Sequence, residues 1–335
     1  VVRIGLVAFG VGFILMSKID SVVAFYAVFL LIAVGSALGG FLTVNIVLVN
    51  WFERRRAQAM AFASMGNGFS GLLVPFIALG LTTFGWRDTA LYSGILVLLI
   101  GLPVSHLIRH APEPFGWAPD GARPTMGPRS SPQSGATTIQ LAGGLSASEA
   151  LHTSSFWLLT LGHTSALVLI SALGAHLIPY LVQDVQMSVE EAARVVAMLT
   201  GLSIAGQIVG GFAGDRMDKR TVAIIGMVGH TLALILLITG DPTLILGFAA
   251  LQGICWGMRG PLMMAIRADY FGRRAFATIE GFASVVTTAG LVAGPLIVGS
   301  MADAFGNYRL GFGVLAIATI AGSVAFAAAR RPVAV

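Results

Sequence analysis

The chain contains unusually few charged residues. Asp, Glu, Lys and Arg together make up 10% of its 335 residues, whereas hydrophobic residues make up 56%. An average soluble protein carries about 25% charged residues. A water-soluble fold of this length would not have enough charges to cover its surface, so the composition excludes an ordinary soluble globular protein.

Cysteine is also scarce, because Cys255 is the only one in the chain. This excludes an intrachain disulfide and a zinc site built on several cysteines. The sequence lacks the GxxxxGKS or GxxxxGKT phosphate-binding loop as well, so it encodes no ATP-driven pump of that type. It contains no clustered nucleophile and base and no set of metal ligands. We therefore expect no enzyme activity, no metal and no cofactor.

Long intervals without any charge alternate with short charged loops. The charge-free intervals include 21–52, 57–86, 89–108, 150–183, 195–214, 221–240 and 310–329. Each has 20 residues or more, and about 20 apolar residues cross a bilayer as a helix. The sequence therefore predicts an all-α polytopic membrane protein. We expect ten membrane helices, at about 1–17, 24–49, 57–83, 88–108, 155–182, 191–213, 221–239, 243–267, 275–301 and 308–329.

The loops between these helices alternate in charge. Of the 20 Lys and Arg residues, 15 fall on one side of the expected bundle, and only Lys18, Arg87, Arg194 and Arg309 fall on the other. The positive-inside rule places the basic side, with both ends of this chain, in the cytoplasm. We expect a multi-pass protein of the plasma (cell inner) membrane, whose basic excess reflects its orientation in the lipid bilayer and not a nucleic-acid partner.

Prolines cluster in one segment of the chain. Six of them lie from Pro112 to Pro132, among Gly and Ser, which predicts a flexible cytoplasmic linker over 110–150. The linker separates an N-terminal helix bundle at 1–109 from a C-terminal six-helix bundle at 151–331. Near its end, Ser146 and Glu149 have the spacing of a capping box, which predicts a helix start there.

The two bundles repeat one another. The segment NWFERRRAQAMAFASMGNGFSGLLVP at 50–75 aligns with DYFGRRAFATIEGFASVVTTAGLVAGP at 269–295, at an offset of 219 to 220 residues. Internal repeats of this kind are typical of secondary transporters. At this offset, residues 155–220 have no counterpart in the first half. We therefore expect two helices to be absent from this chain, so that its ten helices belong to a bundle of twelve; the alternative is a ten-helix protein.

The segment GGFAGDRMDKR at 210–220 concentrates charge between two apolar stretches. Together with the Gly-Pro pattern that ends at Pro295, it resembles the major facilitator superfamily. The segments NWFERRRAQAM, GWR, AHLIPYL and RADYFGRR look more narrowly like the monocarboxylate-transporter and oxalate/formate-antiporter branch of that superfamily. In that branch an Arg often stands where this chain has Gln207, so an anionic substrate would lack its usual partner at this position.

The resemblance implies a monomeric secondary active transporter with the major-facilitator fold, which moves a small organic solute by alternating access. The branch points to an organic anion such as a monocarboxylate, with or without a coupled proton. Three alternatives are weighed. One is a drug or metabolite efflux pump of the same superfamily, and the second is a membrane receptor or scaffold that does not transport. The third is a membrane enzyme, which the lack of a clustered nucleophile and base and of metal ligands disfavours.

Arg259 is the first candidate for a substrate ligand. It lies about 13 Å from the helix end at Ala268 by helical rise, near mid-membrane, where an Arg costs about 2.5–3.5 kcal/mol to insert. Gln252 and Trp256 share its helical face, and the resemblance implies that this helix lines the central cavity. We expect Arg259 to bind an anionic or strongly polar group of the substrate. The alternatives are a structural Arg paired with Glu280 and an Arg whose side chain snorkels to the membrane interface.

Other polar residues inside the expected helices are further candidates. Glu280 is either a proton-coupling carboxylate or the ion-pair partner of Arg259 or Arg267, and we favour the partner. His230 is discounted, because the resemblance places its helix at the periphery. The remaining candidates for hydrogen bonds to substrate are Gln207, Asn67 and His163, each with the alternative of a bond between helices. Gly206, Gly210 and Gly214 predict close contact with a neighbouring helix.

The charged loop itself is predicted to be a gate. Asp215 ends one helix near the cytoplasm, and the repeat symmetry places it against the N-terminus of the helix at 57–83, which favours a carboxylate. The resemblance suggests that it latches the two halves closed. The other expected members of this latch are Arg216, Lys219, Arg220, Arg54, Arg55 and Arg56. The alternative is that these charges only fix the orientation of the chain.

Overall fold

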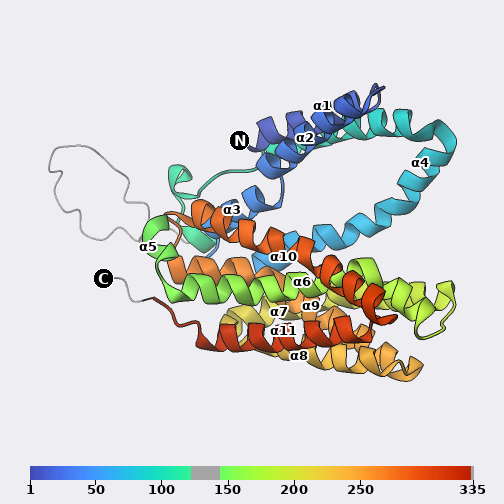
Figure 1. The fold of residues 1–335 in the computed structure, drawn as a ribbon. Helices are drawn as coiled ribbons and strands as arrows, with labels where there is room; N and C mark the ends of the chain where they lie inside the picture. The colour runs from blue at the N-terminus through green and yellow to red at the C-terminus, as the bar shows by residue number, and fades with distance from the viewer. Residues whose placement is uncertain (122–143, 333–335) are drawn as a thin grey trace. The chain divides into compact units, whose positions relative to one another are not determined.

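The computed structural model describes residues 1–121 and 144–332, and for the helical residues 67–72, 74 and 75 it describes the backbone alone. Figure 1 shows these residues as a set of helices. Within the two ranges, the β-structure consists of one isolated bridge between Gly144 and Gly272. The predicted all-α class is confirmed.

The chain divides into two compact units. The first comprises Val1–Arg54 and Phe69–Ser134, and the second comprises Arg55–Gly68 and Gly135–Val335. The sequence places residues 55–68 in the N-terminal bundle, whereas their contacts group them with the second unit, because the start of helix α4 (Arg56–Ser105) packs against helices of that unit. Much of the predicted linker, residues 122–143, lies outside the described residues.

The first unit consists mainly of apolar helices that approach one another through glycine. Its elements are α1 (Val2–Met16), α2 (Val22–Gly39), α3 (Phe41–Trp51), the later part of α4, and the 3-10 turns η1 (Glu113–Phe115) and η2 (Pro119–Gly121). A Cβ added at Gly5 would lie 2.3 Å from the backbone nitrogen of Gly39. The absence of a side chain at Gly5 therefore sets the distance between α1 and α2.

Two helix boundaries in the first unit differ from the prediction. The helix expected at 24–49 is divided at Gly40, which has an extended ψ of −151° and separates α2 from α3. The helices expected at 57–83 and 88–108 instead run together as α4, with a kink at Gly85. The φ of 77° at Gly85 is one that glycine adopts without steric conflict.

In the second unit, the first helix after the linker begins where the sequence predicts a helix start. Its elements, besides the first turns of α4, are α5 (Ala147–Leu151), α6 (Ser154–Gln183), α7 (Val189–Arg216), α8 (Lys219–Thr239), α9 (Pro242–Phe271), α10 (Phe276–Phe305) and α11 (Arg309–Ala328). The predicted capping box of Ser146 and Glu149 is confirmed. The Ser146 backbone N–H donates to the Glu149 carboxylate, and this bond lowers the pKa of Glu149 below its ordinary value.

Glycines bring α7 and α9 into backbone contact. A Cβ on Gly206 or Gly210 of α7 would lie 2.2 Å from a carbonyl oxygen of α9. From the other side, a Cβ on Gly257 would lie 1.8 Å from the carbonyl oxygen of Ser203. The predicted close-packing role of Gly206 and Gly210 is confirmed, and it fixes the distance between the two helices that carry most of the candidate site.

Helix length and apolar composition suit a membrane. Among the described residues, the segments long and apolar enough to cross a bilayer are Val22–Trp51, Phe76–Ser105, Ser154–Gln183, Val189–Arg216, Lys219–Thr239, Phe276–Phe305 and Arg309–Ala328. α9 has a comparable length of 30 residues, but Gln252 and Arg259 lower its mean hydropathy. The helix with the most polar interior is thus the one that carries the first candidate ligand.

We predict that Gly257→Val destabilises the second unit, because its side chain cannot fit against the Ser203 carbonyl unless α7 and α9 separate. Overpacking of this kind typically costs about 1–3 kcal/mol. Thermal unfolding in detergent should therefore begin at a clearly lower temperature. The matched control is Gly201→Val on α7, where an added Cβ meets nothing within 4 Å. Equal melting temperatures for the two variants would contradict this account of the packing.

Candidate functional site

Three arginines are buried in the described part of the chain, and they differ in how their charge is compensated. Arg56 pairs with Asp269, and Arg267 on α9 pairs with Glu280 on α10 at 2.5 Å. Arg259 on α9 is 1% exposed and forms no ion pair with any carboxylate of the described residues. Its Nη1 instead lies 2.8 Å from Nδ1 of His163 on α6.

The Arg259–His163 contact determines which form of the imidazole is present. A guanidinium has only donors, so Nδ1 of His163 must accept the hydrogen bond, and the ring is then neutral with its proton on Nε2. Nε of Arg259 has no partner in the described structure. A full positive charge therefore sits inside the bundle next to a neutral group, with donor capacity to spare. An anion is the ligand that such a site lacks.

Glu280 is the partner of Arg267 and not of Arg259. The side chains of Glu280 and Arg267 are nearly inaccessible to solvent, at 4% and 2% exposure, respectively. The structural alternative for Arg259, pairing with Glu280, is therefore wrong. One atom of each partner, Oε2 of Glu280 and Nη2 of Arg267, has no hydrogen bond within the described residues. The pair is buried and incompletely satisfied.

Gln252 forms a buried side-chain pair with a residue that the sequence discounts. Nδ1 of His230 on α8 lies 2.9 Å from Oε1 of Gln252, and His230 is 0% exposed. Nε2 of Gln252 has no hydrogen-bond partner among the described residues. The sequence analysis discounts His230 because the resemblance places its helix at the periphery of the bundle. No sequence pattern connects His230 with Gln252.

Gln252 and Trp256 line a pocket between α6, α7 and α9, which we call the three-helix pocket. Its volume is about 180 Å³. The lining is otherwise mostly aliphatic, with Leu173 and Leu177 from α6 and Leu199 from α7, and Thr200 is its other polar member. The pocket thus offers apolar walls and very few polar groups.

Two candidates remain, Gln207 and Asn67. Gln207 on α7 is half-buried, is not among the pocket's lining residues, and leaves its Oε1 without a partner in the described structure. Asn67 belongs to α4, but its side chain lies outside the described residues. The structure therefore brings together Arg259 with His163 and Gln252 with Trp256.

The expected contact between Asp215 and the helix at 57–83 is present within the second unit. The carboxylate of Asp215, near the end of α7, accepts hydrogen bonds from the backbone N–H groups of Ala57 at 2.9 Å and Gln58 at 3.0 Å. These N–H groups belong to the first turn of α4, where they have no partner within the helix. Asp215 thus caps α4 from a distant part of the sequence.

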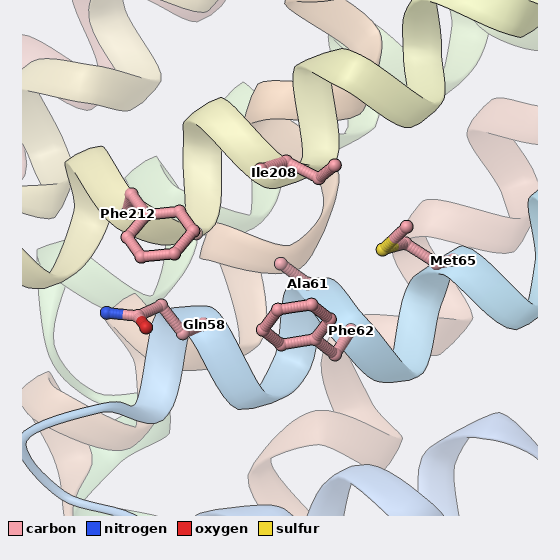
Figure 2. A pocket seen from close by; sticks show the side chains of 7 residues that line it. Gln58, Ala61, Phe62, Met65, Ile208 and Phe212 are labelled. Atoms are coloured by element: carbon pink, nitrogen blue, oxygen red, sulfur yellow. The ribbon is translucent and has the colours of Figure 1, made fainter.

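Figure 2 shows the side chains where α4 meets α7, with Gln58, Ala61, Phe62 and Met65 on one side and Ile208 and Phe212 on the other. The approach is close because α7 has glycine at this point. A Cβ on Gly211 would lie 2.7 Å from that of Ala61. The cap at Asp215 and the small residues next to it therefore hold the start of α4 on α7.

A second carboxylate, which the sequence prediction missed, joins the charges of this region. Asp269, near the end of α9, pairs with Arg56 and also with Lys219 at 2.7 Å. The segment RADYFGRR contains Asp269, but its spacing gives no sign of these partners. Because Arg56, Lys219 and Asp269 come from three helical elements, only the tertiary fold brings them together.

The other expected members of the latch take different positions. Arg220 donates to the carbonyl of Ala329 at 2.9 Å, and Arg216 lies over the ring of Phe212 at 5.6 Å. Arg54 and Arg55 are exposed. Of the basic residues in the charged loop, Lys219 is thus the one that reaches the Asp269 cluster.

The family comparison identifies the chain's relatives. The family model described as Major Facilitator Superfamily matches residues 1–177 and again residues 159–334. The chain is 24% identical over 292 residues to Monocarboxylate transporter 11 of Mus musculus, which covers 82% of this chain and 60% of that protein. It is 26% identical over 147 residues to a triacylglyceride transporter of Mycobacteroides abscessus, which covers 41% of this chain and 28% of the relative. The chain therefore spans less than two thirds of the length of either relative.

Solved structures show the same fold at low sequence identity. The E. coli fucose:proton symporter FucP superposes with a TM-score of 0.73 at 16% identity, covering 99% of this chain and 83% of that one. The human organic anion transporter MFSD10 superposes with a TM-score of 0.73 at 14% identity, covering 97% and 76%, respectively. At these identities the likeness concerns the fold alone.

We predict that Asp215→Asn loosens the first turn of α4. A charge at a helix N-terminus contributes about 0.3–1 kcal/mol, so backbone amides 57 and 58 should exchange with deuterium roughly two to five times faster. Hydrogen exchange followed by mass spectrometry of peptides that cover 55–62 measures this. Asp218→Asn is the control, because Asp218 caps α8. Unchanged exchange at 57 and 58 would show that Asp215 does not hold this helix end.

Proposed function

The chain belongs to the Major Facilitator Superfamily, and from this premise we propose that the protein is a secondary active transporter that moves a small organic anion across a membrane by alternating access. Members with this architecture bind their substrate near the middle of the bilayer, between two bundles that rock around it. The helices of this chain have the length and apolar composition of a multi-pass membrane protein.

The observation that carries the anion assignment is the buried charge of Arg259. An uncompensated buried charge typically costs about 3–5 kcal/mol, and the other two buried arginines have carboxylate partners. A substrate anion at Arg259 and His163 would compensate this charge and accept the donors left free. Arg259 also stands in for the Arg that the resemblance leads us to expect at Gln207.

The relatives support a carboxylate or another organic anion as the substrate class. One is named a monocarboxylate transporter, and a structural neighbour is described as an organic anion transporter. Others are described as a triacylglyceride transporter and a fucose:proton symporter. The names differ in substrate, so the argument for an anion rests on Arg259 and not on these descriptions.

We propose that Glu280 is the site at which a proton could be coupled to transport. Its pairing with Arg267 is buried, and each partner leaves one atom without a hydrogen bond. Protonation of Glu280 would release Arg267 and change the charge next to the substrate path. One structural neighbour is described as a proton symporter, which makes proton coupling a reasonable expectation for this fold.

We also propose that Asp215, with Asp269, Arg56 and Lys219, forms part of a latch on the cytoplasmic side of the plasma membrane. The support is the cap that Asp215 provides for α4 and the convergence of two cations on Asp269. If the latch operates, Asp215→Asn should also increase chemical labelling of the cavity from the cytoplasmic side.

A drug or metabolite efflux pump is the second candidate, because the three-helix pocket is largely apolar. Transport of an uncharged apolar compound would not need Arg259. The two functions are therefore distinguished by whether transport depends on this residue.

We predict that Arg259→Gln lowers uptake of monocarboxylates such as propionate and lactate by roughly ten- to a hundredfold in kcat/KM, because a hydrogen bond to a charged group contributes about 1.5–3 kcal/mol. Uptake is measured in proteoliposomes that contain the complete protein, at two pH values. The melting temperature should stay the same or rise, because the substitution removes an uncompensated buried charge.

Arg267→Gln is the matched control, because it leaves Glu280 buried without its partner and should lower the melting temperature. Loss of stability in Arg259→Gln with normal uptake would mean that Arg259 is structural. Normal uptake of apolar compounds by Arg259→Gln, without uptake of any carboxylate by the unmodified protein, would favour the efflux pump.

A further inference from the structure

The three-helix pocket and the Arg259–His163 pair lie along the same two helices. Arg259 is seven residues after Gln252 on α9, and His163 is seven residues before Ile170 on α6. At the helical rise of 1.5 Å per residue, Gln252 and Ile170 lie about 10 Å along their helices from the charged pair. Trp256, which also lines the pocket, lies about 4.5 Å along α9 from Arg259. Seven residues are close to two full turns, so the two features also share one face of each helix.

The pocket has the size and lining of a site for an apolar group. An apolar cavity of about 150 Å³ is large enough to bind benzene, and this pocket measures about 180 Å³. Leu173, Leu177 and Leu199 provide aliphatic walls, and Trp256 provides an aromatic one. A phenyl ring or a branched aliphatic group of similar size would fill it, whereas a two- or three-carbon acid held at Arg259 would not fill it.

The wall of the pocket also holds one unsatisfied amide. Oε1 of Gln252 is engaged by Nδ1 of His230 at 2.9 Å, while Nε2 of Gln252 has no partner among the described residues. Both residues are buried, at 1% and 0% exposure, so water does not readily supply the missing bond. A buried donor without a partner is unfavourable, and a ligand with an acceptor at this point would relieve it.

We propose that the three-helix pocket determines substrate selectivity by receiving the apolar end of an amphipathic organic anion, and that His230 positions Gln252 to donate a hydrogen bond to an acceptor on that end. This inference rests on the proposed function, because it assumes that the anionic end binds at Arg259. The preferred substrate is accordingly a carboxylate with an apolar body of ring size, and two- or three-carbon acids are poorer substrates. His230 is not among the lining residues of the pocket. It acts on the substrate through its hydrogen bond to Gln252.

Gly174 gives a direct test, because it lines the pocket and an added Cβ there meets nothing within 4 Å. Gly174→Leu should fill the pocket without displacing a helix. In proteoliposomes with the complete protein, the unmodified transporter should take up 3-phenylpropionate with a kcat/KM at least about tenfold above that for propionate. Gly174→Leu should remove this advantage and leave propionate uptake within about twofold.

Gly313→Leu on α11 is the control, since an added Cβ there also meets nothing within 4 Å, and it should leave the preference intact. Equal uptake of the two acids by the unmodified protein, or an equal loss of both in Gly174→Leu, would overturn the selectivity pocket and leave carboxylate transport standing. If neither acid is taken up by the unmodified protein, the proposed function fails, and this inference fails with it.

The role of His230 is tested with a substrate that carries an additional hydrogen-bond acceptor on its apolar end. The unmodified protein should have a lower KM for 3-(4-methoxyphenyl)propionate than for 3-phenylpropionate, by about two- to tenfold for one hydrogen bond. His230→Leu should abolish this difference with little change in the KM for 3-phenylpropionate. His230→Asn, which retains an amide donor near the position of Nδ1, should restore it. If His230→Leu keeps the difference, or if it impairs both substrates equally, His230 has no positioning role.

Discussion

A guanidinium buried among apolar helices is the constraint that organises the second unit. Arg259 is held inside the bundle with His163, a neutral acceptor, as its partner, whereas Arg267 and Arg56 are each neutralised by a carboxylate. In a medium of low dielectric constant, this difference is energetically large. The helix that carries Arg259 packs tightly on α7 through glycine. The second unit thus holds a buried charge that no carboxylate of the described residues compensates.

The carboxylates of the second unit join helix ends and pair with two of its three buried arginines. Asp215 satisfies the first N–H groups of α4, and Asp269 joins Arg56 to Lys219. These contacts fasten the start of α4 onto α7 and α9. Near Arg259, in contrast, the described residues provide an imidazole, amides and apolar walls. The contacts of Asp215 and Asp269 thus lie near helix ends, whereas Arg259 lies in the interior of its helix.

Sequence patterns anticipate those features that depend on local composition. The all-α class, the capping box of Ser146 and Glu149, and the close-packing glycines of α7 are confirmed within the described residues. The helix break at Gly40 and the continuity of α4 through Gly85 are not anticipated, because a single glycine is compatible with a break, a kink or an unbroken helix. The alternative that pairs Arg259 with Glu280 is wrong for a related reason, because Glu280 pairs with Arg267. Spacing along one helix says which face a side chain occupies, but not which neighbouring helix faces it.

The sequence by itself determines that this chain is a helical membrane protein of the Major Facilitator Superfamily with a polar face on α9, because hydropathy and motif spacing are properties of the chain. Only the tertiary structure decides that Glu280 belongs to Arg267, that His163 belongs to Arg259, and that His230 reaches Gln252 from a helix the sequence treats as peripheral. Each of these pairs joins two helices, so the choice of partner depends on the rotation of the two helices and on the distance between them. The packing of whole helices sets the rotation and the distance, and the sequence of one helix alone does not determine that packing.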